Sequence, residues 1–175
     1  MKRKLGIERI TKNGIMLALL CVLGMISIPL GPNIKLSLQL LVIYIICLTA
    51  NSVIDCTTIS LLYLLLGLFL PIYAGFNSSI SPTFGYVISF VVISPIIYFI
   101  NKIPKIIPLL RMFIACITGL IVCYFIGTIF MMFYLSLGLK EVLLISVVPY
   151  IPFDLIKIFI AIHTVKLIPE SIKCA

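Results

Sequence analysis

The chain has 175 residues, of which 63% are hydrophobic and 10% are charged. Soluble domains carry roughly 45–50% apolar residues, so this composition excludes an ordinary soluble domain and predicts one all-α integral membrane domain over residues 1–175. The formal net charge is +8. The basic residues are spread through flanks and loops, which indicates a membrane topology signal and argues against nucleic-acid binding.

Long apolar runs separated by polar or proline-containing segments predict six transmembrane helices. The first follows a basic N-terminal segment and has no A-x-A cleavage site after it, so we expect an uncleaved span. Polar turns are expected near residues 30–39 and 51–55, and the longest uncharged polar loop covers residues 71–83. The predicted helices cover residues 13–28, 38–50, 56–70, 84–100 and 109–135, with a sixth from about residue 153.

Small residues recur at helical spacing in two of these spans. In the fifth span they occupy every fourth position, at Ala115, Gly119, Cys123 and Gly127. Such a ladder lets two helix backbones approach closely, so we expect this face to pack against another helix. Gly14 and Ala18 form a single pair of the same kind in the first span. They are either ordinary small residues of a span or a docking face for a partner helix.

The basic residues predict the orientation of the chain in a cell membrane. With both termini inside, the outer loops hold Lys35 and Lys140, and Lys157 lies within a span. Because loops on the inner side are enriched in Lys and Arg, N-in/C-in is the favoured topology. The remaining ten basic residues then lie on the inner side: Lys2, Arg3, Lys4, Arg9, Lys12, Lys102, Lys105, Arg111, Lys166 and Lys173.

Asp154 and Lys157 are the strongest candidates for a binding site. Pro149 and Pro152 precede them, and proline is tolerated at a helix start, so the last helix is expected to begin near Phe153. Charges three residues apart share a helix face, and each costs about 2.5–3.5 kcal/mol at the centre of a span. The pair either neutralises itself or binds a ligand. A cation near a helix N-terminus favours a small carboxylate-bearing molecule.

Uncharged hydrogen-bonding and aromatic residues gather on the same predicted outer side. They are either part of a plain surface loop or the wall of a pocket for a neutral ring. Gln39, near the outer end of the second helix, is expected to reach the same space. The candidate pocket residues besides Gln39 are Tyr73, Asn77, Phe84 and Tyr86.

Motifs of several enzyme classes do not occur in the sequence. There is no G-x-x-x-x-G-K-[ST], HExxH or GxSxG motif, so we expect neither P-loop ATP binding nor an enzyme activity. One His and six Cys without CxxC spacing predict no metal site, cofactor or disulfide framework. A vitamin-binding transporter subunit, a stand-alone channel or proton-coupled carrier, and a membrane scaffold remain as function classes.

Several stretches resemble the BioY family, the substrate-binding S component of energy-coupling-factor (ECF) biotin transporters. They are KLSLQLL, PIYAG, SPTFGYVISF, the 124–127 stretch and PYIPFDLIK. The resemblance implies a six-helix S component that binds biotin from outside through Asp154 and Lys157. It also implies partners: a transmembrane coupling subunit, for which Gly14 and Ala18 are the expected docking face, and two cytoplasmic ATPase subunits.

The sequence departs from the family pattern in the polar loop. Ser81 and Phe84 stand where the family usually has Gly, and the preceding FNSSIS segment is shorter. A phenylalanine there is expected to narrow or reshape the pocket. Lipoate or another small carboxylate-bearing vitamin is therefore the alternative ligand, and a stand-alone secondary carrier is the alternative mechanism.

Overall fold

The computed structural model describes residues 2–29, 35–76, 78, 80–104 and 107–168. The described residues form a helical bundle with one short hairpin, in which β1 (Ser27–Pro29) pairs antiparallel with β2 (Lys35–Ser37). This confirms the all-α prediction except at the hairpin, where a polar turn was expected. The helices are α1 (Lys2–Met25), α2 (Gln39–Thr49), α3 (Val53–Phe69), α4 (Phe84–Asn101), α5 (Pro108–Leu135), α6 (Leu139–Ser146) and α7 (Ile151–Leu167).

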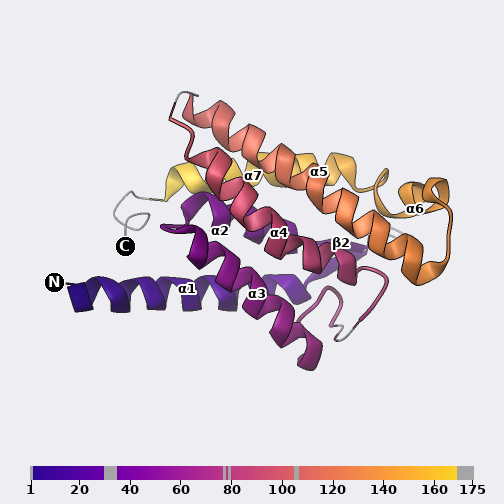
Figure 1. The fold of residues 1–175 in the computed structure, drawn as a ribbon, viewed down its shortest axis with the longest axis horizontal. Coiled ribbons are helices and arrows are strands. Elements are labelled where there is room, and N and C mark those ends of the chain that lie inside the picture. The colour runs from indigo at the N-terminus through magenta and orange to yellow at the C-terminus, as the bar shows by residue number, and fades with distance from the viewer. Residues whose placement is uncertain (1, 30–34, 77, 79, 105–106, 169–175) are drawn as a thin grey trace.

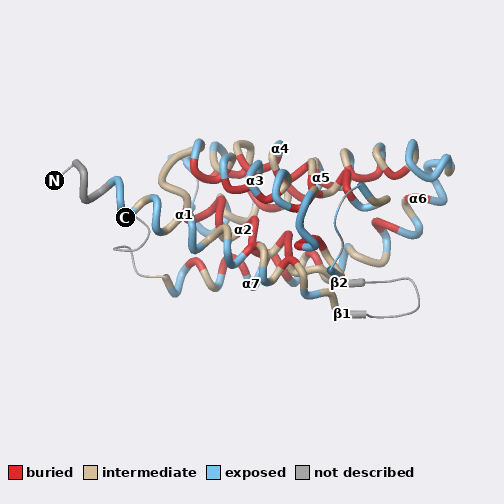
Figure 2. Tube along the Cα trace, turned by 90° about the horizontal axis from the view of Figure 1, so that it is seen from below, coloured by how far each residue is buried: buried red, intermediate tan, exposed pale blue. Residues whose placement is uncertain are grey.

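Helix α2 lies at the centre of the bundle and contacts α1, α3, α4 and α7. Nine of its residues are buried, as expected for an apolar helix at the centre of a bundle. The start of α1 and the end of α7 lie at one end of the bundle, whereas α6 and the hairpin lie at the other (Figure 1). Buried positions gather where the helices face one another (Figure 2).

Helices α4 and α5 make the closest helix pair. The predicted small-residue ladder of α5 is buried. A Cβ at Gly119 would meet the Ile97 side chain, and one at Gly127 would meet the Tyr86 ring. Small residues are required here because the two backbones approach within the space that a side chain would occupy. This confirms the prediction that one face of this helix packs against another helix.

The first helix is longer than predicted. It begins at Lys2, not near residue 13, because Lys, Arg, Leu and Glu are good helix formers and no proline interrupts them. The expected turn at 51–55 is also shorter, since Ser52 caps α3 by accepting a hydrogen bond from the Ile54 N–H. Asp55 is therefore a buried residue of the first turn of α3, where Arg9 Nη2 lies 2.8 Å from its Oδ1.

Fewer than six of the described helices are long and apolar enough to be identified as transmembrane spans. Helices α4 and α5 are long and apolar enough to cross a membrane, and α6 with α7 passes the same test as a pair bent by 50°. Helices α2 and α3 are shorter apolar helices. The prediction of six spans therefore stays a prediction.

We predict that Gly85→Ala destabilises the protein through the α4–α5 contact. A Cβ at Gly85 would meet the Cβ of Phe130, which cannot move without the backbone of α5. Overpacking of this kind costs about 1–3 kcal/mol, so the thermal unfolding midpoint in detergent should fall. Gly14→Ala is the matched control, since no atom lies within 4 Å of a Cβ there. Equal midpoints for the two variants would contradict the close packing.

Candidate functional site

A cavity of about 670 Å³ lies among α2, α4, α5, α6, α7 and the loop between α3 and α4. This volume is within the range of about 300–1,000 Å³ that small-molecule sites usually have. Its apolar wall includes Leu40, Val87, Phe90, Met131, Leu135, Leu144 and Ile145, and its polar residues include Ser37, Gln39, Tyr73, Ser81, Thr83, Tyr86, Tyr124, Ser146, Tyr150, Asp154 and Lys157.

Asp154 and Lys157 form a buried ion pair in this cavity. Lys157 Nζ donates to Asp154 Oδ1 at 2.7 Å, and the two side chains are 8% and 6% exposed. The prolines place the start of α7 as predicted within two residues: the helix begins at Ile151, with Pro152 in its first turn. Asp154 also lies in that first turn, where the helix dipole favours a carboxylate.

Tyr124 of α5 completes this group. Its hydroxyl donates to Asp154 Oδ2 at 2.6 Å, so both carboxylate oxygens of Asp154 have a donor. Tyr124 is not among the site residues predicted from the sequence. The available signal was a tyrosine next to Cys123, inside an apolar helix and beside the small-residue ladder. Because Lys157 has three ammonium N–H groups, further donors remain for a ligand.

Tyr86 connects the cavity wall of α4 to α6. Its hydroxyl donates to Ser146 Oγ at 3.0 Å, and its ring lies over Gly127 of α5. Ser146 was not predicted, since it belongs to a short helix whose sequence indicates only an apolar stretch before the prolines. The contact holds α6 against the cavity and makes it part of the wall.

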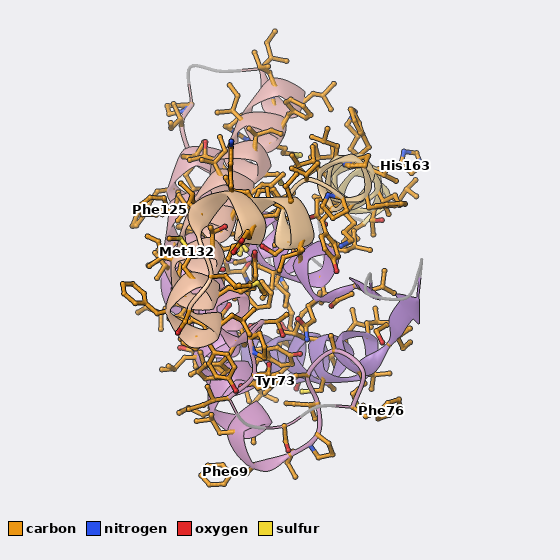
Figure 3. All side chains as sticks on the ribbon, turned by 90° about the vertical axis from the view of Figure 1, so that its right-hand side faces the viewer. Phe69, Tyr73, Phe76, Phe125, Met132 and His163 are labelled. Atoms are coloured by element: carbon orange, nitrogen blue, oxygen red, sulfur yellow. The ribbon has the colours of Figure 1, made fainter. Side chains whose placement is uncertain are left out.

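Gln39 and Tyr73, two of the candidate pocket residues, both line the cavity. Gln39 Nε2 lies 2.7 Å from the Tyr63 hydroxyl. Tyr73 points inward, whereas Phe69 and Phe76 point away from the body (Figure 3). Burial raises the pKa of Tyr73 to about 12, so its hydroxyl stays protonated at neutral pH and donates to the Leu64 carbonyl at 2.6 Å.

Phe84, another candidate pocket residue, is placed differently. Phe84 does not line the cavity. Its ring packs between Tyr73 and Phe130, with ring centroids 6.0 and 5.9 Å away, because the first turn of α4 faces the neighbouring aromatic residues. Asn77 lies outside the described residues.

The family model of the BioY family matches residues 1–173. The chain belongs to the BioY family. It is 26% identical over 159 residues to the biotin transporter BioY of Thermotoga maritima, which covers 88% of this chain and 91% of that protein. It also resembles the crystal structure of the S component for biotin from an ECF-type ABC transporter, with a TM-score of 0.83, 25% identity, and coverage of 95% of this chain and 93% of that one.

Membership of the BioY family agrees with the expectation of a transport component and not an enzyme. In the described part of the chain, no group of three or more His, Cys, Asp or Glu residues is arranged to hold a metal ion.

Gly14 and Ala18 do not line the cavity. Both are exposed on α1, and a Cβ at Gly14 would meet no atom within 4 Å.

We predict that the two charges of the ion pair depend on each other for stability. Lys157→Met leaves the Asp154 carboxylate buried with Tyr124 as its donor, and breaking a buried pair costs about 3–5 kcal/mol. The double variant Asp154→Asn/Lys157→Met removes both charges and keeps an acceptor for Tyr124. Thermal unfolding of the ligand-free proteins should therefore show a lower midpoint for the single variant than for the double. A double variant less stable than the single one would refute the coupling.

Proposed function

We propose that this chain is the substrate-binding S component of an ECF-type importer and that its ligand is biotin. Membership of the BioY family and the similarity to a biotin S component support this function. The observation that carries it is the cavity itself, in which a buried ion pair faces a mixed aromatic and polar wall. Intramembrane charges of this kind mark ligand sites and pathways by default.

The ligand carboxylate binds Lys157 in this proposal. Asp154 already accepts hydrogen bonds on both oxygens, which disperses its negative charge and reduces its repulsion toward an incoming anion. The uncommitted N–H groups of Lys157 then form charge-assisted hydrogen bonds with the ligand. The ring system of the ligand lies toward the wall that holds Gln39, Tyr73 and Tyr86.

The proposed orientation is N-in/C-in with six spans in the cell membrane. The basic residues support it, because the inner side then holds ten of them and the outer loops two. Helices α2 and α3 have 11 and 17 residues, or roughly 17 and 26 Å at 1.5 Å per residue. The central α2 is covered by other helices, so it does not need the full apolar length that contact with lipid requires. The hairpin and α6 then lie on the outer side, with the cavity beside them.

Biotin uptake in this proposal is driven by partners. The sequence contains no P-loop motif, so ATP hydrolysis is assigned to two ATPase subunits that act through a transmembrane coupling subunit. The exposed Gly14 and Ala18 of α1 offer that subunit a face on which another helix can approach closely.

Lipoate stays the alternative ligand, because it also carries a carboxylate. This alternative was motivated by the expectation that Phe84 narrows the pocket. Phe84 does not line the cavity, so it does not narrow it. Lipoate therefore serves as the competitor in binding experiments.

We predict that carboxylate recognition depends on Lys157. The purified wild-type protein should bind labelled biotin, and unlabelled biotinamide should compete poorly. In Asp154→Asn/Lys157→Met, which carries no unpaired charge, affinity for biotin should fall by roughly 30-fold to several thousand-fold, the equivalent of about 2–5 kcal/mol. Biotinamide should lose little further affinity in that variant. Equal binding of acid and amide by the wild type would remove Lys157 from the role of carboxylate partner.

We predict that Ala18→Trp weakens assembly and leaves ligand binding intact. A large side chain on this exposed face of α1 prevents close helix contact. Co-purification with the coupling subunit and ATPases should fall, while biotin binding by the isolated chain stays at the wild-type level. Ile121→Trp on α5, where Ile121 is 63% exposed, is the control for a bulky substitution at the lipid-facing surface. Loss of biotin binding with intact co-purification would instead assign this face to the ligand site.

A further inference from the structure

We infer that Tyr63, a residue that does not line the cavity, orients the Gln39 amide so that the amide oxygen faces the ligand. In this orientation Gln39 selects a ligand that carries an N–H donor. This inference rests on the proposed biotin-binding function. Tyr63 is a positioning residue in this assignment, because it acts on the ligand through Gln39.

The hydrogen bonds of Tyr63 decide which way the Gln39 amide points. A tyrosine hydroxyl has one proton, and Tyr63 donates it to the Ile72 carbonyl oxygen at 3.0 Å, which can only accept. Toward Gln39 the hydroxyl can therefore only accept. The amide atom 2.7 Å from it must be the donor Nε2. A flipped amide would place two acceptors against each other at this distance.

The same orientation leaves Gln39 Oε1 as an acceptor for the cavity. Gln39 lines the cavity and is 6% exposed. Its Nε2 is directed at Tyr63, and its Oε1 accepts no hydrogen bond from the described residues. An amide oxygen that faces the cavity favours a ligand that donates to it, and a ligand without a donor displaces water from this oxygen without replacing the hydrogen bond. The urea ring of biotin carries N–H groups, whereas the dithiolane ring of lipoate carries none.

Packing holds the Tyr63 hydroxyl in place. The side chain is fully buried, and its ring meets the Tyr73 ring edge-on, with centroids 5.6 Å apart. On the side of α1, a Cβ at Gly24 would lie 2.5 Å from the hydroxyl oxygen. The absence of a side chain at Gly24 thus provides the space for the hydroxyl.

The test compares ligands with and without N–H donors in Tyr63→Phe. This variant keeps the ring and removes the hydroxyl, so the Gln39 amide is free to flip. The probes are biotin and a biotin analogue alkylated on both urea nitrogens, each titrated against the full-length purified protein. Affinity for biotin should fall by about 3- to 10-fold, the worth of one neutral hydrogen bond. Affinity for the alkylated analogue should stay unchanged.

Gln39→Leu separates the two residues. If Tyr63 acts through Gln39, the double variant Tyr63→Phe/Gln39→Leu should bind biotin no more weakly than Gln39→Leu alone. Equal losses of both ligands in Tyr63→Phe, or no loss of biotin, would overturn the inference and leave the biotin assignment in place. A wild-type protein that binds lipoate more tightly than biotin, or binds neither, would overturn both the proposed function and the selection for an N–H donor.

Discussion

The buried ion pair between Lys157 and Asp154 is the interaction on which the cavity depends. Two charges within an apolar bundle are stable only when each has its partner and the remaining hydrogen-bonding groups are satisfied. Tyr124 supplies the second donor to Asp154, so α5 and α7 are joined at this point. Removing one member of this group leaves the others buried with fewer partners, so the cavity and the stability of the bundle depend on the same contacts.

Tyrosine hydroxyls connect the rest of the cavity wall to its surroundings. Tyr86 links α4 to α6, and Tyr63 links α2 through Gln39 to the loop that follows α3. In each case a large ring packs in the apolar interior while its hydroxyl finds a specific polar partner, as is usual for buried tyrosine. The polar groups of the cavity are thereby held in defined directions before a ligand enters, which lowers the ordering cost of binding.

Helix α1 contacts both α2 and α3. Near its start, Arg9 and Asn13 both donate to Asp55 of α3, and near its end Gly24 adjoins the Tyr63 hydroxyl. Between them lies the exposed pair Gly14 and Ala18. One face of α1 therefore packs against the bundle, where Leu20 is fully buried, whereas the face that carries Gly14 and Ala18 stays exposed.

The sequence by itself determined the helical class, the α5 ladder and the position of Asp154 and Lys157 on one face of the last helix. Each of these follows from local rules: composition, a four-residue period, and prolines at a helix start. The extra length of α1 was not predicted because charged residues are unfavourable inside a membrane and therefore indicate the end of a span. The same residues are good helix formers, so the helix continues through them. The short strands β1 and β2 were not predicted because three residues are too few to show the alternation of apolar and polar residues that indicates a strand.

Tertiary structure decided which further residues line the cavity or contact its wall. Tyr124, Ser146 and Tyr63 come from three different helices, and no sequence spacing relates them to Asp154, Tyr86 or Gln39. Phe84 turned toward Tyr73 and Phe130 and away from the cavity, because neighbouring rings offered it a packed environment. Such choices depend on contacts between segments far apart in the chain, and the burial and hydrogen-bond energies that decide them exist only once the helices have packed.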